Sequence, residues 1–293
     1  MPDNNELQTS LEELDLGERQ LSSLPQGVGQ LTQLKSLNLY RNKLTSLPTS
    51  VWCLTNLQRL NLSVNHFSSL SEQIGNLIDL EMLDLGHNRL TALPESIGNL
   101  GSLVFLYLSN NRLTSLPDTL KNLRSLIYLN CTDNRLSSVP DWIDDLSSLI
   151  ELRLYNNLIA ALPGSIGALT NLKELHLMNN QLALLPASIG NLTSLKKLGL
   201  MDNQLTSLPE SLGNLQRLTD LDLRNNRLAE LPASLRELRN LRSLDLRANK
   251  LTVLPESLGD LADLEKLDLR WNKISSIPAS VQRLEQQGCV IFY

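Results

Sequence analysis

The chain has 293 residues, with 26 Lys or Arg, 31 Asp or Glu and a formal net charge of −5 at pH 7. Without a basic excess, binding to nucleic acid through phosphate neutralisation is disfavoured, and no run of about 18 apolar residues is present that would insert into a membrane. The length alone suggests about two domains. The residues instead predict one continuous stack of repeats.

The dominant feature is an internal repeat of constant length. The pattern L-x-x-L-x-L-x-x-N-x-L begins at Leu11, returns at Leu34 and Leu57, and continues at the same spacing to Leu264. We therefore divide the chain into a short N-terminal cap (1–10), twelve repeats (11–286) and a closing C-terminal strand (287–293).

Each repeat carries its own secondary-structure signals. Counted from the first Leu, apolar positions 4 and 6 alternate with polar positions 3 and 5, which predicts a short strand. The Asn at position 9 ends the strand. A Pro follows at position 15 in eleven of the twelve repeats, and it begins a return segment that we expect to be a single turn or irregular. One repeat is too small to bury its own core, so stacking must stabilise it.

At these residues the chain resembles leucine-rich repeat proteins of the 23-residue type, with repeats such as LTALPESIGNLGSLVFLYLSNNR. It is similar to intracellular Ras-group-related and bacterial members. The resemblance implies an α/β solenoid: a right-handed horseshoe with a concave parallel β-sheet and an irregular or short-helical convex side, binding proteins on its concave face. It also implies that the position-9 Asn side chains form a structural ladder on neighbouring backbone, from Asn42 to Asn272.

Some repeats depart from the pattern. The first has Arg19 where Asn is expected, and the third has Ser71 in place of Pro. Cys131 occupies a core Leu position, which indicates a small buried thiol. Val290 and Phe292 fall one repeat length after Leu267 and Leu269, so we expect them to continue the core in a thirteenth strand. An exposed solenoid end is an open sheet edge, and a homodimer through it is a hypothesis.

Candidate partner-binding residues are those predicted to face the concave side or its rim, at positions 3, 5, 7 and 8. Four of the five tyrosines and all three internal methionines lie there, and aromatic residues, Met and Arg are enriched in interface cores. The alternative is that these side chains merely cover the sheet. The candidates in the first nine repeats are Tyr40, Met82, Phe105, Tyr107, Tyr128, Arg153, Tyr155, His176, Met178 and Met201.

The last three repeats share the sequence Asp-Leu-Arg. It stacks Asp222, Asp245 and Asp268 at position 5 and Arg224, Arg247 and Arg270 at position 7. Two interpretations are open. The columns could neutralise each other, since like charges on adjacent strands repel. Alternatively, Arg224, Arg247 and Arg270 form a charged docking stripe with Trp271 at its end. Trp52 and Trp142 lie on return segments, where we expect half-exposed packing or a convex contact.

Residues for catalysis or cofactor binding are not recognised in the sequence. It contains no phosphate-binding G-x-x-x-x-G-K-[ST] loop and no G-x-S-x-G elbow. His66 and His87 lie in neighbouring repeats, but no further ligand completes a metal set. We therefore expect no enzyme activity, no catalytic residue, no metal and no cofactor.

The sequence thus predicts a non-enzymatic scaffold that binds a partner protein in signalling or host–pathogen interaction. One alternative is a regulatory or targeting domain of a larger enzyme, such as a GTPase, kinase or ubiquitin-ligase effector. Another is an extracellular recognition protein, which predicts an export signal or terminal disulfides. The N-terminus carries acids where a signal peptide needs basic residues, and Cys53, Cys131 and Cys289 are far apart. A cytoplasmic location is expected, with signal-less secretion left open.

Overall fold

The computed structural model describes residues 10–25 and 27–293. The predicted N-terminal cap therefore lies almost wholly outside the described residues. The chain forms two compact units, Met1–Leu136 and Ser137–Tyr293, which we call the N-terminal and C-terminal units. The boundary falls inside the sixth repeat.

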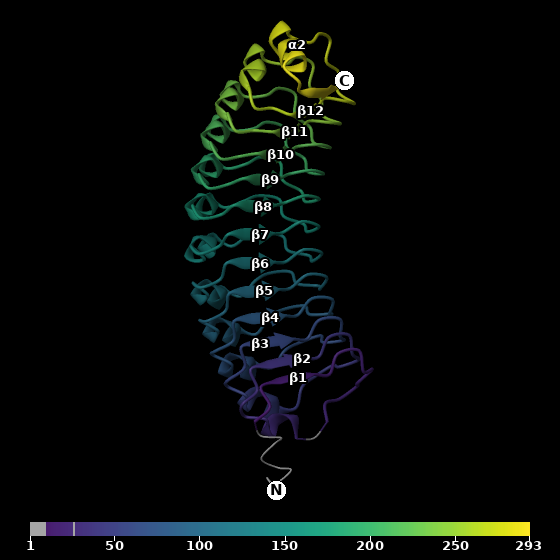
Figure 1. The fold of residues 1–293 in the computed structure, drawn as a ribbon, viewed down its shortest axis with the longest axis vertical. Helices are drawn as coiled ribbons and strands as arrows, with labels where there is room; N and C mark the ends of the chain where they lie inside the picture. Colours follow the sequence, from purple (N-terminus) through teal and green to yellow (C-terminus); the bar gives the residue numbers. More distant parts are fainter. Residues whose placement is uncertain (1–9, 26) are drawn as a thin grey trace. The chain divides into compact units, whose positions relative to one another are not determined.

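The N-terminal unit contains a parallel sheet whose strands follow one another in chain order (Figure 1). Each strand pairs with the equivalent residues of the next repeat, so the sequence period is also the register of the sheet. The strands are β1 (Glu13–Asp15), β2 (Ser36–Asn38), β3 (Arg59–Asn61), β4 (Met82–Asp84), β5 (Phe105–Tyr107) and β6 (Tyr128–Asn130). Between them lie 3-10 turns η1 (Val28–Gln30), η2 (Thr49–Cys53), η3 (Glu72–Asn76), η4 (Glu95–Asn99) and η5 (Asp118–Asn122).

The C-terminal unit is built in the same way. Its strands are β7 (Glu151–Arg153), β8 (Glu174–His176), β9 (Lys197–Gly199), β10 (Asp220–Asp222), β11 (Ser243–Asp245), β12 (Lys266–Asp268) and β13 (Val290–Phe292). Its turns are η6 (Asp141–Asp145), η7 (Gly164–Ala168), η8 (Ala187–Asn191), η9 (Glu210–Asn214), η10 (Ala233–Glu237) and η11 (Glu256–Asp260), followed by helix α2 (Ala279–Gln286). The predicted parallel strands and single-turn return segments are confirmed within each unit.

The core is the layer of leucines that the repeat pattern predicts. In β4 the middle residue, Leu83, is fully buried, whereas Met82 and Asp84 on either side of it are half-buried. The other apolar positions of the fourth repeat, from Leu80 to Leu100, are buried as well. Burial of these aliphatic side chains against the adjacent repeats supplies the main driving force for folding.

The return segments begin where the sequence places proline. Pro94 precedes η4 with φ −68° and ψ 149°, an extended conformation from which the turn starts. Ser71 takes over this place in the third repeat, where its side chain accepts a hydrogen bond from the Gln73 amide at 3.2 Å. Gly98 lies closer to its neighbour than a side chain allows, since a Cβ there would be 2.4 Å from the Thr119 carbonyl oxygen. Close stacking of the turns therefore requires glycine at this position.

The predicted asparagine ladder is present. Asn111 is buried; its side-chain oxygen accepts from the Leu90 amide at 2.9 Å, and its amide nitrogen donates to the carbonyls of Leu85 and Leu108 at 2.9 and 3.1 Å. The same pattern extends to Asn272 in the last repeat. These bonds satisfy backbone groups that the turn after each strand leaves unpaired.

The closing strand forms, but its predicted register was wrong. Relative to β12, β13 begins one position later than the repeat length requires, so Ile291 lies opposite Leu267 and is buried, whereas Val290 and Phe292 are exposed. The cause is α2, which replaces the 3-10 turn of earlier repeats and is followed by Gly288 with φ +104°. The segment from Leu267 to Ile291 is therefore one residue longer than a repeat, and a slip of one position reverses the two faces of a strand.

Two further expectations concern individual side chains. Trp52 was expected to be half-exposed, but it is buried in η2; Trp142 is half-buried. Cys131 is fully buried as predicted, and burial raises the pKa of its thiol to about 12.

No helix in the described part of the chain is both long and apolar enough to cross a membrane.

Candidate protein-interaction surface

Each unit presents one sheet face that is not covered by its own core. Side chains alternate along a strand, so the middle leucine points into the core and the residues at positions 3 and 5 point away from it. In β5 this leaves Phe105 37% exposed while Leu106 is fully buried. We call this side the open face.

In the N-terminal unit, the open face carries an aromatic patch formed by Met82, Phe105, Tyr107 and Tyr128. These residues come from three paired strands, with Met82 opposite Phe105 and Phe105 opposite Tyr128. The rings of Tyr107 and Tyr128 are tilted at 42° with centroids 5.0 Å apart, and the Asn130 amide lies 3.3 Å from the Tyr128 hydroxyl. The structure therefore brings these four predicted residues together.

The edge of the aromatic patch includes an acidic side chain that sequence reasoning did not single out. Asp84 lies directly opposite Tyr107 in the parallel pairing and accepts a hydrogen bond from the Gly86 amide at 2.9 Å. Burial raises the pKa of the Asp84 carboxyl, outweighing the hydrogen bonds that lower it. The sequence could have identified Asp84, because it occupies position 5 of the repeat that precedes the aromatic strand.

Tyr40 belongs to the same unit but not to the patch. It is half-buried and follows β2, with β3 between it and β4. At the equivalent position the next two repeats carry Ser63 and Gly86, so no aromatic side chain links Tyr40 to Phe105. The other half of the expected track, beginning at Tyr155, belongs to the C-terminal unit.

In the C-terminal unit, Tyr155, Met178 and Met201 follow consecutive strands and are all half-buried. The loops that carry them are hydrogen-bonded to one another through the backbone. The Asn156 backbone N–H donates to the Met178 carbonyl, and the Asn179 backbone N–H donates to the Met201 carbonyl. Met178 lies over β9 because Gly199 has no side chain; a Cβ there would be 2.4 Å from the Met178 sulfur. The predicted rim column is therefore present within this unit.

Beside that column lies a charged group made of Glu151, Arg153, Glu174, His176 and Lys197. Arg153 donates to Glu151, His176 Nε2 is 3.1 Å from Glu174 Oε2, and Lys197 Nζ is 3.0 Å from Glu174 Oε1. Burial acts to raise the pKa of Glu174, but hydrogen bonds from Lys197 and His176 leave it lowered. Sequence analysis identified Arg153 and His176 and missed both glutamates, although they occupy position 3 of adjacent repeats.

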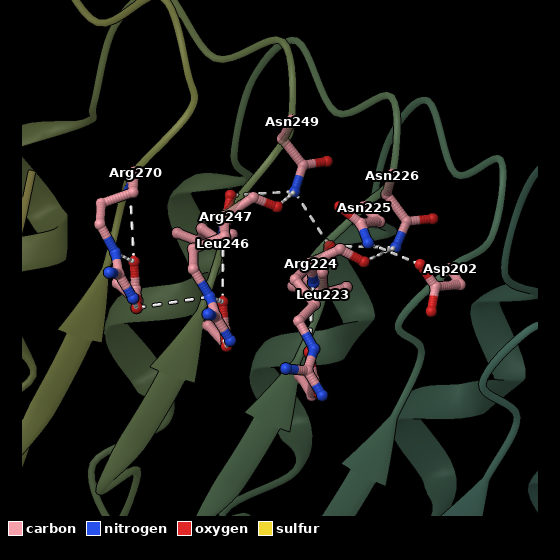
Figure 2. A network of polar contacts seen from close by, with 12 residues as sticks. Asp202, Leu223, Arg224, Asn225, Asn226, Leu246, Arg247, Asn249 and Arg270 are labelled. Carbon is pink, nitrogen blue, oxygen red and sulfur yellow. Dashed lines mark hydrogen bonds and ion pairs between the residues drawn. The ribbon is translucent and has the colours of Figure 1, made fainter.

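The Asp-Leu-Arg repeats form an ion-pair ladder, and Figure 2 shows Arg224, Arg247 and Arg270 in the segments that follow consecutive strands. Arg247 Nη2 is 2.6 Å from Asp245, and Arg270 Nη2 is 2.7 Å from Asp268. Arg224 makes a longer contact of 3.2 Å with Asp222. Each arginine is thus paired with an aspartate of its own repeat, which favours mutual neutralisation over a free docking stripe.

The ladder ends in an aromatic group at the C-terminal strand. Trp271 is 71% exposed, and the Arg270 guanidinium lies 5.6 Å from its ring and 4.9 Å from that of Phe292. Trp271 and Tyr293 also line a shallow hollow of about 350 Å³. Phe292 was expected in the core, and the shifted register of β13 places it on the open face instead.

Comparison with known families gives matches along most of the chain. The family described as a leucine-rich repeat region matches residues 50–154 and 119–202. The leucine rich repeat family matches 9–67 and 216–274, and the two-copy leucine rich repeats match 193–237. A search of curated proteins gave no match.

Several solved structures are similar to the chain. A leucine-rich repeat protein of Leptospira interrogans is 38% identical with a TM-score of 0.90, over 97% of this chain and 72% of that one. The ectodomain of the Arabidopsis thaliana receptor kinase GASSHO1/SCHENGEN3 is 35% identical with a TM-score of 0.76, over 97% of this chain and 38% of the receptor chain. An internalin of Listeria monocytogenes is 25% identical with a TM-score of 0.80, over 96% of this chain and 86% of that one.

Proposed function

Because the chain belongs to the leucine-rich repeat family, we propose that it is a non-enzymatic scaffold that captures a partner protein on the open face of its sheet. This face corresponds to the concave side predicted from the sequence. A role in signalling or host–pathogen interaction is part of the proposal. Function in a repeat fold depends on the side chains that the scaffold presents, so the proposal depends on the open-face residues.

The observation that carries it is the aromatic patch. Exposed aromatic side chains and Met on adjacent strands offer a large apolar area with few flexible bonds, which is typical of interface anchors. Phe105 is exposed, Met82 is half-buried, and the half-buried Tyr107 and Tyr128 pack together with polar hydroxyl groups. A partner that covers this patch would gain binding free energy from apolar burial.

The comparisons support the class of function. The Arabidopsis receptor ectodomain was solved in complex with CASPARIAN STRIP INTEGRITY FACTOR 2, and the latrophilin 3, Unc5D and FLRT2 complex includes a leucine-rich repeat chain. We propose that this chain also acts by binding. Cys53 and Cys289 form no disulfide, which supports our proposal that the chain works in a reducing compartment such as the cytoplasm.

The proposal is tested by affinity capture with a triple variant, Phe105→Ala, Tyr107→Ala and Tyr128→Ala. The matched control replaces three exposed apolar residues outside the strands: Ile78→Ala, Leu184→Ala and Val253→Ala. We expect the first variant to lose partners that the unaltered chain and the control retain, with unchanged circular dichroism. Equal capture by all three proteins would rule out the aromatic patch as the binding site.

A further inference from the structure

The charged group on the open face of the C-terminal unit contains three side chains that commonly bind metals. One ligand atom from each of Glu151, Glu174 and His176 lies within 4.8 Å of the others. Two residues come from β8 and one from the neighbouring β7, so strand pairing places their backbones side by side. Among the described residues, no other group of three His, Cys, Asp or Glu side chains meets this distance criterion.

From this geometry we propose that Glu151, Glu174 and His176 bind a divalent transition-metal ion such as Zn²⁺. Ligand atoms bound at about 2.1 Å lie at most about 4.2 Å apart. His176 Nε2 is 3.1 Å from Glu174 Oε2 and 3.9 Å from Glu151 Oε1. Both separations suit two ligands of one ion, and the two glutamate oxygens lie within 4.8 Å of each other.

The donor set determines which ion is favoured. Imidazole suits zinc, nickel and other transition metals, whereas magnesium and calcium take oxygen ligands. His176 therefore provides selectivity that two carboxylates alone would lack. Three protein ligands leave at least one position for water or for a group from another molecule.

The two cations beside the site hold the carboxylates in place. Lys197 binds Glu174 through Oε1, which leaves Oε2 turned toward His176. Arg153 Nε donates a hydrogen bond to Glu151 Oε1, the oxygen that faces His176, so this oxygen would accept from Arg153 while it binds the ion. Hydrogen bonds to ligand carboxylates orient them for metal. The same two cations also offset the negative charge, so we expect binding that is selective but weaker than in a buried structural zinc site.

Isothermal titration calorimetry with zinc chloride tests the proposal. The chain should carry no histidine tag and should have Cys53→Ser, since Cys53 is an exposed thiol that would bind zinc independently. The test variant is His176→Gln, which keeps a polar side chain on the open face. The matched control is His87→Gln, which removes an exposed histidine from the N-terminal unit.

We expect one zinc ion per chain, at least about tenfold weaker binding in the His176→Gln variant, and no change in the His87→Gln variant. Cobalt should bind at the same stoichiometry, and magnesium should not compete. Circular dichroism checks that each variant is folded. The proposal is overturned if zinc does not bind, if His176→Gln binds it equally well, or if magnesium binds with similar affinity.

Discussion

The Arg247 guanidinium on the segment after β11 lies 3.4 Å from the Asp268 carboxylate of β12. Because Arg270 also binds Asp268, one aspartate is shared by arginines of two repeats. Asp268 is only 1% exposed. Burial acts to raise its pKa, but hydrogen bonds from Arg270 and the charge of Arg247 leave it lowered. The ladder therefore connects adjacent repeats as well as neutralising charge.

This relationship predicts that Asp268→Asn destabilises the C-terminal unit by about 2 kcal/mol, since it leaves two partly exposed arginines without their shared partner. Asp222→Asn is the control, because Asp222 pairs with Arg224 of its own repeat at the longer distance of 3.2 Å. We expect that change to stay within about 0.5 kcal/mol. Urea unfolding at neutral pH measures both. Equal losses of stability in the two variants would show that sharing Asp268 between two repeats does not stabilise the unit.

Asp84 gives a prediction for pH. Burial raises its pKa in the folded chain above the ordinary value of 3.8, so the folded state takes up a proton more readily than the unfolded state. This contribution to stability is fully present below pH 3.8 and is lost as pH rises through the folded pKa. We expect Asp84→Asn to be up to about 1 kcal/mol more stable than the unaltered chain at pH 7.

Asparagine is a suitable replacement because other repeats already use it there. Asn61 and Asn130 accept the same backbone hydrogen bond that Asp84 accepts from Gly86. Urea unfolding from pH 3 to pH 7 should show a gap between variant and unaltered chain that grows with pH. A gap that is constant or shrinks would contradict a raised pKa at Asp84.

The ladder position Asn111 should be much less tolerant of change. Asn111→Ala leaves the buried Leu90 amide without its partner and removes one of the two side-chain donors to the Leu85 carbonyl, which keeps Asn88, at a cost of about 3 kcal/mol. Asn122→Ala at the exposed end of η5 is the control, with an expected change below about 0.5 kcal/mol. Thermal and urea unfolding give both values. If both variants lost less than about 0.5 kcal/mol, water would be replacing the hydrogen bonds of the asparagine ladder.

The register of β13 determines whether Ile291 or Val290 is buried. If the constant repeat spacing continued to the end of the chain, Val290 would be the buried residue. Ile291 is 9% exposed and Val290 is 55% exposed. Ile291→Ala should therefore destabilise the C-terminal unit by about 2–4 kcal/mol, and Val290→Ala by less than about 0.5 kcal/mol. Urea unfolding of the two variants decides between the registers, since a larger loss for Val290→Ala requires the unshifted one.

The sequence by itself determined the repeat, the leucine core and the asparagine ladder. The reason is that each depends on a pattern that recurs at a constant spacing, from Leu34 to Leu264 in the core and from Asn42 to Asn272 in the ladder. A parallel stack converts that period directly into strand register. The membership of Met82, Phe105, Tyr107 and Tyr128 in one patch was predictable for the same reason.

The tertiary structure decided what depends on local departures from the period and on side-chain conformation. The helix α2 and Gly288 shift β13 by one position, which moves Phe292 from the expected core to the open face beside Arg270. The approach of His176 to two glutamates depends on how side chains of adjacent strands turn toward each other. A periodic pattern fixes which residues share a face, but only packing and hydrogen bonding fix which atoms meet.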